Sequence, residues 1–143
     1  MVLNPNLSIA LSLNGWARLW LGELDAAIDL QARAMRLSPR DPQIFIMELA
    51  TAFAHLCAGR YGEASAWAGR AFSDQPNYMG SLACSAASYA HTERLDKARK
   101  AVARLRELDP TLRVSNLKEW TPFRRSEHLA RWEEGLRKAG LPE

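Results

Sequence analysis

Apolar residues recur every three or four positions along most of the chain, a spacing that is typical of amphipathic helices. The clearest example runs from Ser8 to Pro39, where a turn at Gly22 separates two such stretches. The same alternation continues further along and predicts six helices, at residues 8–21, 24–37, 42–58, 61–73, 77–91 and 94–107. Neither helix of a pair can bury its apolar stripe alone, so we expect the pairs to stack on one another.

This rhythm breaks at residues 111–125. A last helix is predicted from Ser126, because Leu129, Trp132 and Leu136 then share one stripe. A stack of helical pairs needs a terminal helix with one polar side. The last helix is the candidate for that position.

The helical pairs form an internal repeat. Prolines recur at intervals of 34, 37 and 34 residues, at Pro5, Pro39, Pro76 and Pro110. Alanine recurs with a similar period near the start of each second helix, at Ala27, Ala64 and Ala98. A period of this length indicates a stacked helical-repeat architecture.

The period and these positions resemble the tetratricopeptide repeat (TPR), a 34-residue helix-turn-helix unit marked by W-x2-L-G-x2-Y, A-x3-F, A and P. The resemblance covers residues 3–112. The matching residues are Leu11, Gly15, Gly22, Ala27, Ala34 and Pro39 in the first unit, Gly59, Tyr61, Ala64, Ala71 and Pro76 in the second, and Leu82, Ala86, Tyr89, Ala98 and Pro110 in the third. The chain departs from the pattern at Asn14, Arg18 and Glu93, where leucine, tyrosine and glycine are usual, and it carries three extra residues near Pro42.

The resemblance implies an all-α fold, a TPR-like right-handed helical solenoid with three helix-turn-helix repeats and a capping helix. The repeats are expected at residues 8–41, 42–78 and 79–112, with a linker and the capping helix at 113–143. Residues 1–7 are either the end of a preceding repeat or the point at which the chain was started. We favour the first of these, and it implies a piece of a longer protein.

A second resemblance concerns the tail. The sequence EHLARWEEGLRKAGLPE, together with GRYGEA and RLRELDP, is similar to the extreme C-terminus of bacterial multidomain adenylate cyclases. That family joins a nucleotide cyclase domain to TPR-like repeats. The resemblance therefore implies the C-terminal TPR region of a bacterial signalling protein, a regulatory part that carries no cyclase catalytic residues.

The TPR resemblance also implies a binding face. In such a solenoid the first helix of each repeat lines the concave side. The groove is then lined by Ile9, Ser12, Trp16, Leu19 and Trp20, by Ile46, Leu49, Phe53 and Leu56, and by Ala83, Ala87 and His91. Two interpretations stay open for this apolar face. Either it binds a helix or an extended peptide of a partner, or it is core that the last helix or a second copy of the chain covers.

Two alternatives to an apolar peptide groove are a clamp for a peptide carboxylate and self-association. TPR domains that clamp a peptide carboxylate use lysine and asparagine on the inner face, but here those places hold Ser12, Trp16, Leu49, Phe53, Ala83 and Ala87. A clamp for a chaperone tail is therefore not expected. Self-association into a homodimer stays as an alternative, because no preceding repeat covers the apolar side of helix 8–21.

Composition indicates the setting. The 143 residues, 48% apolar and 24% charged, suffice for one globular domain. No apolar run reaches the roughly 18–20 residues that cross a bilayer, and the first residues lack the pattern of a signal peptide. Cys57 and Cys84 fall inside helical patterns. Two buried thiols in a reducing compartment are thus expected, and with them a cytoplasmic location.

The formal net charge of +3 comes from the last third of the chain. The predicted helix 94–107 carries five cations, Lys97, Arg99, Lys100, Arg104 and Arg106. Such a helix binds nucleic acid in some proteins. Asp96, Glu107 and Asp109 are interleaved with these cations, however, which favours a solvated convex face.

Patterns for catalysis and metal binding are missing from the sequence. His55, His91 and His128 fall on three different helices, without H-E-x-x-H or paired-cysteine spacing. There is also no G-x-S-x-G and no Walker loop. We expect no enzyme activity, no cofactor and no metal. The expected partner is a protein or peptide, rather than nucleic acid or a membrane.

Overall fold

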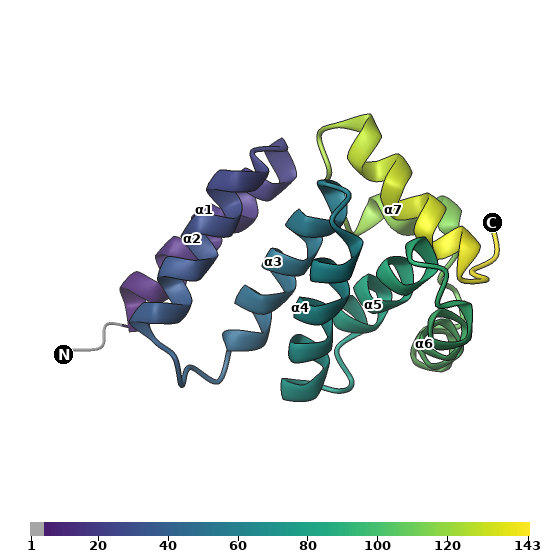
Figure 1. Ribbon diagram of the computed structural model, residues 1–143, viewed down its shortest axis with the longest axis horizontal. Helices are drawn as coiled ribbons and strands as arrows, with labels where there is room; N and C mark the ends of the chain where they lie inside the picture. Colours follow the sequence, from purple (N-terminus) through teal and green to yellow (C-terminus); the bar gives the residue numbers. More distant parts are fainter. Residues whose placement is uncertain (1–4) are drawn as a thin grey trace.

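The computed structural model describes residues 5–143, which form seven α-helices and one short 3-10 helix (Figure 1). The elements are α1 (Pro5–Leu21), α2 (Leu24–Leu37), α3 (Ile44–Cys57), α4 (Tyr61–Asp74), α5 (Met79–His91), α6 (Leu95–Leu108), η1 (Val114–Glu119) and α7 (Ser126–Lys138). That part of the chain contains no strand, so the expected all-α class is confirmed. Of the predicted segment 1–7, residues 1–4 lie outside the described residues and the rest opens α1.

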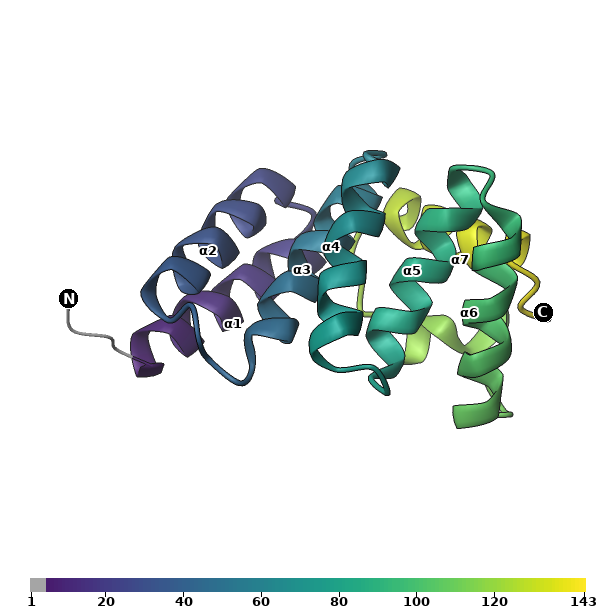
Figure 2. The same ribbon diagram turned by 60° about the horizontal axis from the view of Figure 1, so that its bottom comes forward.

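The first six helices form three antiparallel pairs, α1 with α2, α3 with α4 and α5 with α6, and the pairs stack in chain order (Figures 1 and 2). Within the stack α3 contacts both α1 and α5, and these three helices form an inner layer, while α2, α4 and α6 lie outside it. The alanines that mark the repeat, Ala27, Ala64 and Ala98, are at most 1% exposed. Their small side chains let the two helices of each pair approach closely. None of the described helices is both long and apolar enough to span a bilayer.

The turn inside each pair has the same geometry. Its central residue is in the left-handed region, with φ of 90° at Gly22, 83° at Gly59 and 62° at Glu93. The next residue donates its N–H to a carbonyl five residues back, Glu23 to Arg18 at 2.9 Å, Arg60 to His55 at 2.8 Å and Arg94 to Tyr89 at 2.9 Å. Glycine adopts this conformation freely, whereas a residue with a Cβ does so at a cost of about 1–2 kcal/mol. The departure at Glu93 therefore changes the residue but keeps the turn.

A buried polar contact joins α1 to α2. Gln31 is fully buried, and its Oε1 accepts a hydrogen bond from Ser12 Oγ at 2.8 Å while its Nε2 donates to the Ser12 carbonyl at 2.9 Å. Gly15 makes room for this amide, because a Cβ there would lie 2.5 Å from Gln31 Nε2. The hydroxyl of Ser12, which the sequence places in the groove, thus points to α2. Ser8 lies inside α1 and donates to the Ala34 carbonyl at 2.9 Å.

The C-terminal segment folds back over the inner layer. After η1 the chain reaches the end of α1, where the Arg124 N–H donates to the Trp20 carbonyl at 2.8 Å. Helix α7 then runs over α5 and α3 (Figure 1). The last residues return to η1, where the Val114 N–H donates to the Pro142 carbonyl at 2.8 Å. The helix that was expected to cap the stack therefore covers its inner layer, because its apolar stripe matches the apolar side chains there.

Candidate functional site

Aromatic side chains of α1 and α3 form a cluster with the C-terminal segment. The sequence predicts a shared face for Trp16, Trp20 and Phe53, and their ring centroids lie 5.4 Å apart for Trp16–Trp20 and 6.1 Å apart for Trp20–Phe53. Phe123 and Trp132 complete the cluster, with Phe123 at 4.9 Å from Trp20 and Trp132 at 5.0 Å from Phe53. Such pairs contribute about 0.5–1.5 kcal/mol each beyond their burial. The chain's own C-terminal segment thus occupies part of the expected groove.

Small residues bring α7 onto α5. A Cβ built on Gly135 would lie 2.8 Å from Ala87 Cβ and 2.9 Å from His91 Nε2, so the two helices are as close as glycine allows. Ala83 and Ala87 are fully buried beneath this contact. The small residues of the third repeat therefore form the surface of α5 against which α7 packs.

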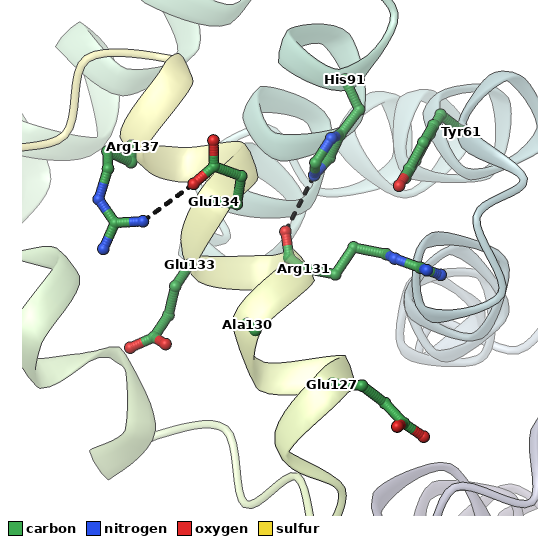
Figure 3. Close-up of a pocket in the computed structure, with 8 residues that line it drawn as sticks. All are labelled: Tyr61, His91, Glu127, Ala130, Arg131, Glu133, Glu134 and Arg137. Carbon is green, nitrogen blue, oxygen red and sulfur yellow. Dashed lines mark hydrogen bonds and ion pairs between the residues drawn. The ribbon is translucent and has the colours of Figure 1, made fainter.

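Polar contacts fix α7 along the same face (Figure 3). His91 Nε2 lies 2.9 Å from the Arg131 carbonyl oxygen, and its ring stacks on Tyr61 with 4.3 Å between centroids. The Arg131 guanidinium donates to the Cys57 carbonyl at the end of α3. A cation is favourable there, because the last carbonyls of a helix lack helical partners and carry partial negative charge.

Most of the predicted groove is consequently closed. The side chains of the inner layer that are at most 3% exposed include Leu19, Leu49, Phe53, Leu56, Ala83 and Ala87. Over the second and third repeats the interpretation in which the last helix covers this face is the one that the structure shows. Phe123 and Trp132 of the C-terminal segment pack against the aromatic side chains there.

One part of the inner face stays open, and we call it the α1 patch. It consists of Ile9, Leu13 and Trp16 of α1 with Ile46 of α3, around a hollow of about 180 Å³. Ile9 is 43% exposed and Leu13 is 65% exposed. Trp16 and Ile46 are half-buried. Leu13 was missed in the sequence, although it lies four residues after Ile9 and three before Trp16 on the same face of the helix.

The two cysteines of the chain lie in the interior of the stack. Cys57 and Cys84 are free and buried, as the sequence predicts. Burial raises the pKa of Cys57 to about 12 and also raises the pKa of Cys84, so both stay protonated near neutral pH. Within residues 5–143 no three histidine, cysteine or acidic side chains come together in a way that suits a metal ion.

The close packing of α7 on α5 can be tested by substituting Gly135. Alanine is the better helix former by about 1 kcal/mol. At this position its Cβ meets Ala87, so we expect Gly135→Ala to destabilise the chain by about 1–3 kcal/mol in urea unfolding. Gly69→Ala is the matched control, because no atom lies within 4 Å of its added Cβ and it should stabilise. A Gly135→Ala variant that gained stability as Gly69→Ala does would contradict the close packing of α7 on α5.

Comparison with known proteins supports the architecture. No protein-family model and no curated protein matches the sequence. Among solved structures, the first TPR domain of Spaghetti (RPAP3) bound to the HSP90 peptide SRMEEVD aligns with a TM-score of 0.70, covering 94% of this chain and 97% of that one at 19% identity. The NMR structure of the first TPR domain of human RPAP3 aligns with a TM-score of 0.69, covering 95% and 97% at 19% identity. The chain has the fold of a TPR domain.

The TPR fold confirms the helical solenoid that the 34-residue period predicts. The structure also shows where two of the residues that depart from the TPR pattern lie. Asn14 and Arg18, which replace the usual leucine and tyrosine, are exposed on α1, and Arg18 pairs with Glu23 at 3.0 Å. This end of the TPR stack therefore carries polar side chains, in contrast to the α1 patch.

Proposed function

We propose that this chain is a protein-interaction module that binds an amphipathic helix of another protein on the α1 patch. The observation that carries the proposal is the exposure of Leu13 and Ile9 beside a hollow, on a face whose remaining apolar side chains are covered. Exposed, contiguous apolar surface on a soluble domain commonly marks a site of association.

The α1 patch continues a helix-binding surface that the chain already uses. Trp16 contacts both Trp20 and Phe53, and Phe53 contacts Trp132 of α7. Helix α7 occupies that surface with a Trp and Leu stripe, so the same layer accepts an amphipathic helix over the second and third repeats. A partner helix with a leucine or aromatic anchor would extend this row over the first repeat.

Peptide binding is also known for one of the similar structures, the TPR domain bound to an HSP90 peptide. The proposed ligand here differs in chemistry. The places that hold lysine and asparagine in carboxylate-clamping TPR domains carry Ser12, Trp16, Leu49, Phe53, Ala83 and Ala87 in this chain. We therefore propose an apolar anchor rather than a terminal carboxylate.

The test is a selection of helical peptides from a phage-displayed library on the wild-type chain, with counter-selection on Leu13→Asp. Enriched peptides are expected to carry leucine or aromatic residues one turn apart. Fluorescence anisotropy of a labelled peptide should show affinity about tenfold weaker for Leu13→Ala, since the contact of one leucine is worth about 1–2 kcal/mol. Leu108→Ala, at an exposed apolar position on α6, is the control.

Two results would contradict this function. Failure to enrich any peptide that depends on Leu13 would remove the α1 patch as a binding surface. Sedimentation equilibrium that shows a dimer, dissociated by Leu13→Asp, would assign the patch to a second copy of the chain instead.

The place of this module in a larger protein is a separate proposal. The tail resembles the C-terminus of bacterial multidomain adenylate cyclases, which supports a regulatory role in signalling. A nucleotide cyclase domain in the same reading frame upstream of Val2 is the expected finding. A stop codon directly upstream would contradict this context and leave the binding proposal untouched.

A further inference from the structure

Helices α4, α5 and α6 follow one another along the stack (Figure 2). Side chains of these three helices line a second apolar hollow, with α5 between α4 and α6. We call it the convex groove, and its volume is about 330 Å³. Phe72 from α4 and Leu82 and Tyr89 from α5 supply its apolar lining. Phe72 is 40% exposed, so a large aromatic face is open to a ligand. Gly69 widens the groove, because no atom lies within 4 Å of the position of its missing Cβ.

One wall of the convex groove is cationic. Lys97, Lys100 and Arg104 all line it, and their spacing of three and four residues places them in one row along α6. The row is about 10 Å long at 1.5 Å per residue. The residues that line the groove from α4, Gly69 and Phe72, carry no charge.

These cations are only partly engaged by the protein. Arg104 donates to Asn77 at 3.0 Å and pairs with Glu107 at 2.9 Å. Lys97 Nζ lies 5.5 Å from the centroid of the Tyr89 ring. Over the part of the chain that the structure describes, Lys100 forms no ion pair. Positive charge on this wall of the groove therefore remains available to pair with a ligand.

We infer that the convex groove is a second docking surface, and that its occupant is an acidic amphipathic helix of a partner protein. Leucine or phenylalanine side chains on one stripe of such a helix fit the lining of Phe72, Leu82 and Tyr89. Carboxylates beside that stripe, spaced three or four residues apart, meet the row of cations on α6. Helix α6, which corresponds to the basic helix predicted at residues 94–107, would then recognise a protein.

The apolar lining decides between this occupant and nucleic acid. Phosphates would pair with the cations but would leave Phe72 and Leu82 uncovered. The remaining cations of α6, Arg99 and Arg106, lie outside the groove lining, so they do not extend the row into a broad basic surface. An acidic helix uses both the charge and the apolar lining.

The experiment measures binding of a fluorescein-labelled helical peptide of about 14 residues, with leucine on one face and glutamate beside it. We expect the full chain to bind it with a Kd below about 100 μM and with lower affinity at higher salt. Lys97→Glu with Lys100→Glu should weaken binding by about tenfold or more. Gly69→Leu should weaken it similarly by filling the groove, and the added Cβ meets no atom within 4 Å.

The controls separate this surface from general charge and from the α1 patch. Arg99→Glu with Arg106→Glu changes the net charge equally and should leave the Kd within about twofold. The part of the binding that depends on Lys97 and Lys100 should persist in Leu13→Asp, so failure of the α1 patch and failure of the convex groove can be told apart. Thermal unfolding of each variant confirms that it folds.

Several results would overturn the inference. They are no binding of the glutamate peptide up to about 1 mM, equal losses in the control pair, or equal binding of a peptide with lysine in place of glutamate. Tighter binding of duplex DNA or of phosphatidylserine vesicles, with the same dependence on Lys97 and Lys100, would assign the row of cations to a phosphate-bearing ligand instead.

Discussion

Replacing Trp132 with alanine is expected to lower the free energy of unfolding by about 3–5 kcal/mol. The Trp132 side chain is fully buried, and it contacts Phe53 on α3 at 5.0 Å and Trp120 at 6.2 Å between ring centroids. Its removal leaves a cavity between α7 and the inner layer that neighbouring side chains cannot fill. Urea unfolding followed by far-UV circular dichroism measures the change.

Trp67→Ala is the matched control for this substitution. Trp67 is half-buried on α4 and lies under the Arg70 guanidinium at 4.6 Å, so its loss should cost clearly less. Equal effects of the two substitutions, or a loss below about 1 kcal/mol for Trp132→Ala, would show that α7 does not seal the inner layer in solution. Increased binding of a hydrophobic dye by Trp132→Ala would report the uncovered face directly.

The second large effect is a dependence of stability on pH that arises from Glu48. This residue lies on α3, is 7% exposed, and its Oε1 has no hydrogen-bond partner among residues 5–143. Burial, and secondarily the carboxylate of Asp74, raise the pKa of Glu48 from 4.5 to about 8, against the opposing charge of Arg70. The folded chain therefore keeps this proton at neutral pH.

The sign of the effect follows from proton linkage. Between pH 4.5 and about 8 the folded state holds a proton that the unfolded chain releases, so the stabilisation is complete below pH 4.5 and is lost as the pH rises through 8. Glu48→Gln should remove this loss and stabilise the chain by about 2–4 kcal/mol at pH 9 relative to wild type. At pH 4 the two proteins should differ little.

The difference between the two proteins isolates Glu48 from other titrations. Burial lowers the pKa of both His55 and His128 in the folded chain. These two groups therefore make the chain more stable as the pH rises from the lowered folded-state pKa to the ordinary histidine pKa of the unfolded chain. They act equally in wild type and in Glu48→Gln, so they cancel. Glu23→Gln, at an exposed position, serves as the control. A parallel pH dependence in wild type and Glu48→Gln would contradict a protonated Glu48.

The helices of this chain are readable from its sequence because they depend on neighbours three and four residues away. The bounds predicted for α2 agree with the structure, and those of α4 and α6 differ by one residue. Helix α3 begins at Ile44 instead of residue 42, because the Asp41 carbonyl accepts the Ile44 N–H in a turn before it. Spacing alone does not show such a local bond.

The candidate site was harder to predict because it depends on contacts between distant residues. The apolar stripe of α7 and the small residues of α5 are both visible in the sequence, yet only the fold shows that Gly135 meets Ala87. Leu13 was missed because the groove residues were taken from the TPR resemblance, whereas the exposure of Leu13 beside Ile9 and Trp16 is visible only in the fold. Glu48 appears an ordinary acidic residue until the fold places it in an apolar interface beside Asp74.

The hydrogen bond from Arg131 to Cys57 joins residues 74 positions apart in the chain. In most solenoids each repeat touches only its neighbours, and folding spreads along the array. Here translation must run on from α5 to α7 before the aromatic inner surface is sealed, an interval of roughly 2–10 seconds on the ribosome. During that interval the apolar side chains that α7 later covers lie uncovered, and uncovered apolar surface of this kind favours aggregation.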